Sequence, residues 1–161
     1  MQMLLYLYAV IRGGVYPNSK SAGILYKPAK RDINESSTAM NGLIPADERI
    51  ITAMEREGNG EFIPKLTIKK DGTVSKVNES FIDYEDFDVI FDYIEQIMKS
   101  VGNKLSSGDI EVSPIDGRES NACKYCDYAA VCGIEDSEIE RIEKLRNSQV
   151  IDKIKESIYG D

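Results

Sequence analysis

The sequence contains no histidine. This absence excludes a histidine general base, a Ser-His-Asp triad and histidine metal ligands. Three cysteines are present, and an odd number does not suit a complete disulfide framework. No apolar run approaches the roughly 18 residues that a membrane span needs. The apolar stretch 3–11 lacks a basic flank and a small-residue cleavage site, so we do not interpret it as a signal peptide. We therefore predict a cytoplasmic protein, and in a reducing cytoplasm clustered cysteines more often bind metal.

Composition limits the class of protein further. The chain has 161 residues, 42% of them hydrophobic, which is enough for one domain with a hydrophobic core. The net charge of −8 argues against nucleic-acid binding over the whole surface, although it does not exclude a local basic strip. The clear basic cluster of the first half is interpreted as a solvated loop; it consists of Lys20, Lys27, Lys30 and Arg31.

Local patterns predict a mixed α/β chain. We expect helices over 1–11, from Pro45 to Gly58, from Asp83 to Gly102 or Gly108, and in the charged tail from Asp136 onward. We expect strands over 22–27, over 64–70 and 73–77 around the turn Asp71-Gly72, and over 110–112. Residues 29–41 are polar and rich in serine, which predicts a loop.

Two helices have a clear apolar face. In the helix after Asp83 it consists of Phe87, Ile90, Ile94, Ile97, Met98 and Val101. In the tail it consists of Ile151, Ile154 and Ile158, which we expect to pack on the domain. The first helical pattern is already running at residue 1 with no capping residue before it, which leads us to expect a piece of a longer protein.

The cysteines are spaced as Cys123-x2-Cys126-x5-Cys132. Thiolates are soft ligands, and three within ten residues can converge on one centre. Zinc and iron–sulfur sites usually have four protein ligands, so the fourth lies outside this chain or the site is incomplete. The spacing favours an iron–sulfur cluster over zinc, which stays an alternative, as do three unrelated buried thiols.

The segment 121–133, Asn-Ala-Cys-Lys-Tyr-Cys-Asp-Tyr-Ala-Ala-Val-Cys-Gly, resembles the C-terminal end of the B subunits of AddAB-type helicase/deoxyribonucleases. The opening 1–9 is similar to the Gln-x-x-x-Tyr motif of RecB-like nucleases, through Gln2 and Tyr6. Segments 21–28 and 40–44 look like those that follow it there. The resemblance implies that Cys123, Cys126 and Cys132 are three of four ligands of a 4Fe–4S cluster, with the fourth cysteine upstream.

Residues Gln2 and Tyr6 are four apart, so an amide and a phenol share one helix face. The resemblance implies an accessory catalytic role in which this face lies beside a metal site and helps to position a DNA strand. Judged alone, the pair fits an ordinary amphipathic helix better, and only the resemblance favours the accessory role.

The resembled family belongs to the PD-(D/E)xK nucleases, which implies a partial restriction-endonuclease-like core over 1–133 and a helical tail over 134–161. It also implies Mg²⁺ in the complete nuclease site, ATP in the parent complex, DNA ends as substrate and the A subunit as partner. No Asp or Glu here has a Lys two positions later, and no Gly-Lys-Ser/Thr phosphate loop is present. We therefore expect the isolated chain to be inactive, with the catalytic acids and Lys upstream.

Two other functions stay open at this point. One is a non-enzymatic zinc or iron–sulfur module that mediates protein contacts, which the acidic composition would suit. The other is a CRISPR-associated nuclease of the Cas4 type. The long insert between Tyr26 and Cys123 fits the B subunit better than the Cas4 type.

Overall fold

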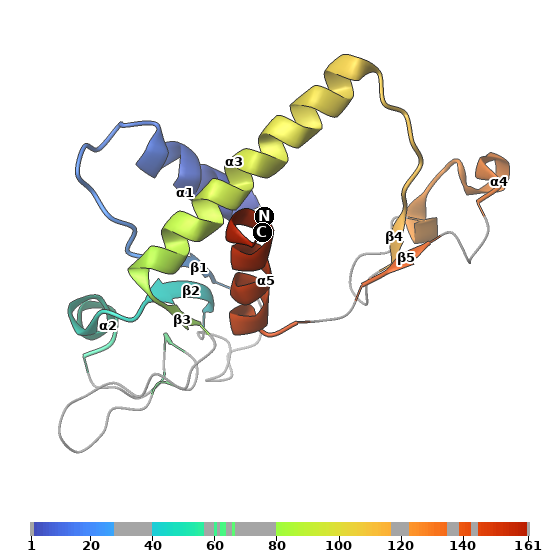
Figure 1. Ribbon diagram of the computed structural model, residues 1–161. Helices are drawn as coiled ribbons and strands as arrows, with labels where there is room; N and C mark the ends of the chain where they lie inside the picture. The colour runs from blue at the N-terminus through green and yellow to red at the C-terminus, as the bar shows by residue number, and fades with distance from the viewer. Residues whose placement is uncertain are drawn as a thin grey trace.

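The computed structural model describes residues 2–27, 40–56, 60, 62–63, 66, 80–116, 123–134, 139–142 and 145–160. The helices in these ranges are α1 (Gln2–Arg12), α2 (Glu48–Met54), α3 (Tyr84–Ser107), α4 (Ala129–Cys132) and α5 (Asn147–Tyr159), with a 3-10 helix at Cys123–Tyr125. The strands are β1 (Ile24–Tyr26), β2 (Asn41–Pro45), β3 (Phe81–Ile82), β4 (Ile115–Asp116) and β5 (Glu140–Arg141). Figure 1 shows α1, α3 and α5 gathered beside the first three strands, while β4, β5 and α4 lie apart from them.

Strand β2 is the central strand of a mixed three-stranded sheet. It pairs antiparallel with β1, so that Ile24 lies opposite Leu43. On its other edge it pairs parallel with β3, so that Ile44 lies opposite Phe81. The sheet therefore joins segments that are far apart in the sequence and brings the start of α3 beside β2.

The main core is built around α3. Its buried residues are Ile82, Phe87, Ile90, Phe91, Ile94 and Ile151. Helix α1 covers this cluster with half-buried apolar side chains, namely Leu4, Leu5, Leu7, Tyr8 and Ile11. Burying a side chain of this size stabilises a fold by roughly 1.5–3 kcal/mol. The amphipathic faces of α1, α3 and α5 therefore account for the way these three helices pack.

A second cluster lies under α2. Its buried members are Ile44, Ile51, Ile63 and Leu66. Glu55, directly after α2, is buried, and its carboxylate accepts hydrogen bonds from the backbone N–H groups of Ile63 (2.9 Å) and Phe62 (3.4 Å). A buried carboxylate needs such partners, so Glu55 ties the end of α2 to this part of the chain.

The mixed α/β class predicted from the sequence is confirmed, and so are several elements. The expected first helix is α1, and the expected strand 22–27 contains β1. The long helix begins after Asp83 and ends at Gly108, which takes the left-handed conformation (φ 71°) that favours glycine. In the tail, Ile151 and Ile154 are buried as expected, and Ile158 is half-buried.

Other expectations were wrong. Pro45 is the last residue of β2, and α2 begins later, after Asp47, whose carboxylate accepts a hydrogen bond from the backbone N–H of Arg49. Residues 110–112 form no strand; the strand of that region is β4, after Pro114. The tail is not helical throughout as expected, because β5 (Glu140–Arg141) pairs with β4 before α5 begins at Asn147.

The apolar face of α3 is only partly covered. Met98 and Val101 are 42% and 49% exposed, although the spacing predicts them on the packed face. Helix α3 is long enough to extend past the elements that pack on it in the described residues. Most of the expected loop 29–41 and of the hairpin 64–77 lies outside the described residues, but Asn41 begins β2.

Candidate functional site

Helix α1 presents the predicted Gln2–Tyr6 pair to solvent. The side-chain amide of Gln2 donates a hydrogen bond of 2.7 Å to the hydroxyl of Tyr6. Both side chains are exposed, and Tyr6 retains 55% of its accessible surface. The pair therefore forms one polar patch on the face of α1 that points away from the core. Its proposed role at a nuclease site stays a prediction.

Several contacts fix α1 on α3, and thereby fix the direction in which this patch points. The guanidinium of Arg12 pairs with the carboxylates of Asp92 at 2.9 Å and Asp88 at 3.3 Å. The ring of Tyr8 packs edge-on against that of Phe91, with centroids 6.1 Å apart. Exposed ion pairs contribute only about 0–1 kcal/mol each, so the apolar contacts hold α1 and the ion pairs set its register.

The three cysteines lie on a short segment of their own. Cys123 is half-buried, whereas Cys126 and Cys132 are exposed, and no disulfide joins them. A turn connects the first two, since the N–H of Cys126 donates to the carbonyl of Cys123 at 3.3 Å. Helix α4 ends at Cys132, and Gly133 follows it in the left-handed conformation (φ 69°). The alternative of three buried thiols does not hold for Cys126 and Cys132.

Strands β4 and β5 bracket the cysteine segment in sequence. They pair in parallel, with Ile115 opposite Glu140 and Asp116 opposite Arg141. In Figure 1 this unit lies well to the side of α1, so the fold does not bring the cysteines to the Gln2–Tyr6 patch. The two predicted sites are therefore separate features of the described chain.

A soft metal centre fits the cysteine segment by the type of its donor atoms. Thiolate sulfur is the ligand that iron–sulfur clusters and structural zinc prefer, and the exposed thiols of Cys126 and Cys132 are open to a ligand. The side chains are not yet arranged around one point: within the part of the chain that the structure describes, no three Cys, Asp or Glu side chains are placed to hold a metal ion. For the same reason, these described residues form no site that could hold Mg²⁺ by themselves.

A polar cluster at the start of α2 was missed from the sequence. The hydroxyl of Tyr84 donates to the carboxylate of Asp47 at 3.3 Å, and the ammonium of Lys20 lies 4.9 Å from the centre of the Tyr84 ring. The side chain and the backbone N–H of Arg49 both donate to Asp47, which holds the pKa of that carboxyl far below its ordinary value. Burial, and then the charge of Asp47, raise the pKa of Tyr84.

No local pattern could reveal this cluster, because Asp47 and Tyr84 are 37 positions apart. Lys20 and Tyr84 also line a hollow of about 130 Å³, together with Glu85 and Asp88. One cation and two carboxylates give this hollow no single sign of charge. We therefore regard the cluster as a structural connection between α2 and α3.

Residues 1–133 match the family described as the PD-(D/E)XK nuclease superfamily. The chain belongs to this superfamily, and the match ends at the glycine that follows the last cysteine. The small mixed sheet with helices beside it is consistent with the partial nuclease core that the sequence predicts.

Individual relatives of this chain share one more specific name. The chain is 26% identical to the B subunit of the ATP-dependent helicase/deoxyribonuclease of Alkaliphilus metalliredigens, in a match that covers 96% of this chain and 15% of that protein. It is 29% identical to the protein of the same name from a Thermoanaerobacter species (84% and 13% covered) and 28% identical to that of Clostridium tetani (100% and 16%). The chain therefore spans about 15% of the length of the curated relatives that it matches. Within the described residues, none of the helices is both long enough and apolar enough to span a membrane.

Proposed function

We propose that this chain is the nuclease-domain part of the B subunit of an ATP-dependent helicase/deoxyribonuclease, which acts on double-strand DNA ends in recombinational repair. The observation that carries the proposal is the nuclease-family match over 1–133, the range that contains both the Gln2–Tyr6 patch and the three cysteines. The names of the relatives support the assignment to that subunit.

In this proposal the chain supplies only part of the nuclease site. The exposed amide and phenol of Gln2 and Tyr6 contact the DNA strand beside the metal site, and their mutual hydrogen bond orients both groups. The acids that bind Mg²⁺, and the Lys that accompanies them in the family motif, come from outside residues 1–161, because no Asp or Glu here has a Lys two positions later. The isolated chain is then inactive.

The cysteine segment has a structural role. Cys123, Cys126 and Cys132 provide three ligands of a 4Fe–4S cluster, and a cysteine outside this chain provides the fourth. When bound, such a group joins segments that are distant in sequence, and its binding free energy becomes folding free energy. The local structure supports this role, because the turn at 123–126 and the end of α4 place the thiols on one short segment, where those of Cys126 and Cys132 are exposed.

The partners follow from the same assignment. They are DNA ends and the A subunit of the heterodimer, with ATP used in the complete complex, in the cytoplasm. We place the nuclease part at 1–133 and a packed tail at 134–161; the buried residues Ile151 and Ile154 of α5 hold that tail to α3.

The test is the activity of the complete heterodimer with Gln2→Ala and with Tyr6→Phe. We expect Mg²⁺-dependent DNA cleavage to fall about tenfold or more, as for loss of a positioning contact, with ATP hydrolysis unchanged. Val10→Ala is the matched control, because Val10 is also on α1 and 41% exposed. Cleavage that is unaffected by both variants would remove the accessory role. A Mg²⁺-dependent cut made by the isolated chain would contradict the division of the site.

A further inference from the structure

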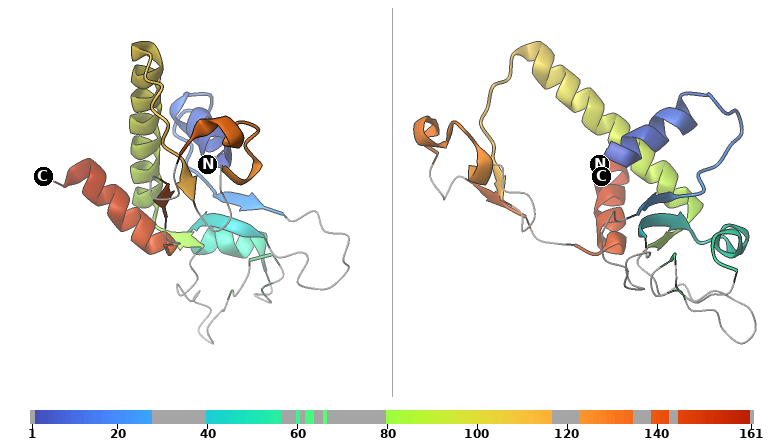
Figure 2. Two further views of the ribbon diagram at one scale, coloured as in Figure 1. Left: turned by 90° about the vertical axis from the view of Figure 1, so that its right-hand side faces the viewer. Right: turned by 180° about the vertical axis from the view of Figure 1, so that it is seen from behind.

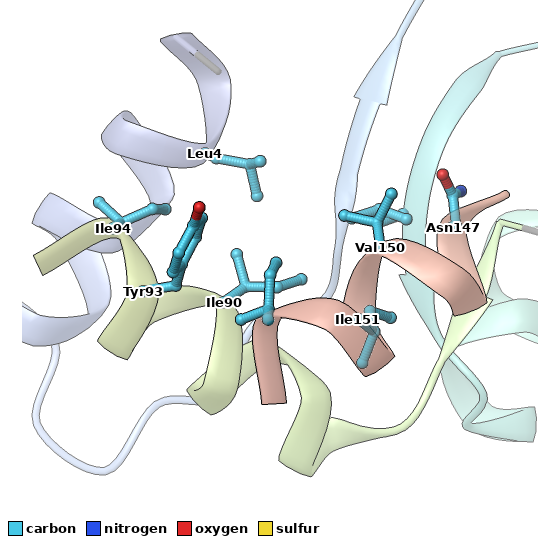
Figure 3. A pocket seen from close by; sticks show the side chains of 9 residues that line it. Leu4, Ile90, Tyr93, Ile94, Asn147, Val150 and Ile151 are labelled. Carbon is cyan, nitrogen blue, oxygen red and sulfur yellow. The ribbon is translucent and has the colours of Figure 1, made fainter. Parts of the chain in front are cut away.

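An apolar groove lies between α1, α3 and α5. It encloses about 260 Å³ and is lined mainly by Leu4, Ile90, Tyr93, Ile94, Val150 and Ile154. Figure 3 shows the side chains of Leu4, Tyr93 and Val150 around this open space, from the three helices in turn. The polar groups at the groove are the hydroxyl of Tyr93 and the side-chain amide of Asn147. This composition suits apolar side chains of a protein segment better than a charged small molecule.

The floor of the groove continues as an apolar stripe along α3. Ile90, Ile94, Ile97, Val101 and Leu105 are spaced by three or four residues, so they share one face of the helix. Ile90 and Ile94 are buried (6% and 2% exposed), whereas Val101 and Leu105 are 49% and 74% exposed. Figures 1 and 2 show why: the C-terminal half of α3 projects beyond α1 and α5.

The groove and the stripe together form one track. From Ile90 to Leu105 it is about 22 Å long, at the usual rise of an α-helix. An exposed apolar track that runs on from a core marks a surface for another protein segment. A straight apolar track of this length matches an amphipathic helix of about four turns, which would place apolar residues at every third or fourth position along it.

We propose that this track binds an amphipathic helix from the part of the helicase/deoxyribonuclease subunit that lies outside residues 1–161. The inference rests on the proposed function. The relatives supply ample chain for such a helix, because the matched region is only 15% and 16% of the length of two of them. The bound helix inserts side chains between Leu4 and Val150 and covers Val101 and Leu105.

The experiment uses the complete subunit and three single variants on α3. Val101→Glu and Leu105→Glu place a charge on the track. Asn103→Glu places the same charge on the opposite, exposed face of the same helix and is the matched control. Hydrogen exchange of the backbone amides in 97–107 is measured in each protein, and light scattering gives its mass.

We expect slow exchange over 97–107 in the unsubstituted subunit. Val101→Glu and Leu105→Glu should each accelerate it about tenfold or more, and Asn103→Glu should not. Fast exchange in the unsubstituted subunit, or equal exchange in the three variants, would overturn the proposal. So would a dimer that Leu105→Glu dissociates, because a second copy would then occupy the track.

Cleavage of DNA ends by the same preparations separates this inference from the proposed function. An active nuclease with fast exchange over 97–107 would refute the docked helix alone. Slow exchange that responds to the two track variants, in a subunit that cuts no DNA with its partner present, would refute the proposed function and leave the docked helix standing.

Discussion

Gly42 on β2 lies directly against the backbone carbonyl of Ile24 on β1. A Cβ atom at position 42 would collide with that carbonyl oxygen and would lie 2.8 Å from its carbon, closer than real Cβ atoms come. The backbone of β1 cannot move away without breaking its pairing with β2. The close approach of the two strands therefore depends on a residue without a side chain.

We expect Gly42→Ala to destabilise the fold strongly, by about 2–4 kcal/mol, because it separates the β1–β2 pair. Gly102→Ala is a matched control with the opposite expected sign: Gly102 is an exposed residue inside α3, and an added Cβ there meets nothing within 4 Å. That change should stabilise by up to about 1 kcal/mol, since alanine favours helix. Denaturant unfolding of both variants measures the difference. Equal effects of the two substitutions would show that the strands are not so close.

The contact of α5 with α3 gives a second prediction. Ile151 is 7% exposed and belongs to the main core, so Ile151→Ala should lower the free energy of unfolding by about 2–4 kcal/mol. Its neighbour Val150 is 39% exposed, so Val150→Ala should cost clearly less. Denaturant unfolding distinguishes them. Similar small losses for both would mean that α5 does not close the core.

Asp47 predicts a dependence of stability on acid. Hydrogen bonds from the side chain and backbone of Arg49 hold the pKa of Asp47 far below its ordinary value of 3.8. A carboxyl whose pKa is lowered by folding adds stability that is complete above its ordinary pKa and is lost as the pH falls below it. The gap in free energy of unfolding between the unsubstituted protein and Asp47→Asn should therefore be constant near neutral pH and should shrink below about pH 4.

Arg49→Met provides the control for this experiment. Without the guanidinium, the largest cause of the low pKa of Asp47 is removed. The same Asp47→Asn substitution made in the Arg49→Met background should then have a smaller effect at neutral pH and a weaker dependence on acid. A gap that does not change with pH in either background would mean that the charge of Asp47 does not stabilise the fold.

Metal analysis tests the cysteine segment. In the complete subunit purified without oxygen we expect about four irons and four sulfides per chain, and Cys123→Ala, Cys126→Ala and Cys132→Ala should each lower both. Val131→Ala is the control, because Val131 lies beside Cys132 and is 80% exposed. If the cluster joins distant segments, the three cysteine variants should also weaken binding to DNA ends. A result of one zinc and no sulfide per chain would mean that the segment holds a structural zinc site and not an iron–sulfur cluster.

Patterns within one element were predictable from the sequence. The spacing of Ile90 and Ile94, and of Ile151 and Ile154, identifies two faces that are buried in the structure. The separation of Gln2 and Tyr6 gives the shared face on which they form a hydrogen bond. Each of these features depends only on the period of a helix, and therefore on residues that are close together in the sequence.

Features that need distant partners were not predictable. The parallel pairing of β2 with β3 joins strands of five and two residues, too short to show an alternating pattern. Asp47 meets Tyr84, and Glu55 is buried, only because the fold brings other segments to them. Pro45 followed by acids looked like the first turn of a helix, but its backbone is used by the sheet. The exposure of Val101 could not be foreseen, because helical spacing does not tell how far a covering element reaches.

The parallel direction of β4 and β5 constrains how this protein can be altered. Two parallel strands cannot be joined by a tight turn; a crossover of about a dozen residues or more has to return the chain to the starting side. The cysteine segment lies within that crossover. A deletion that replaces it with a two-residue turn would therefore also abolish the β4–β5 pair, whereas a neutral linker of similar length could preserve it. Substitution of the three thiols would thus leave this connection intact, whereas shortening it would require this pair of strands to be rebuilt.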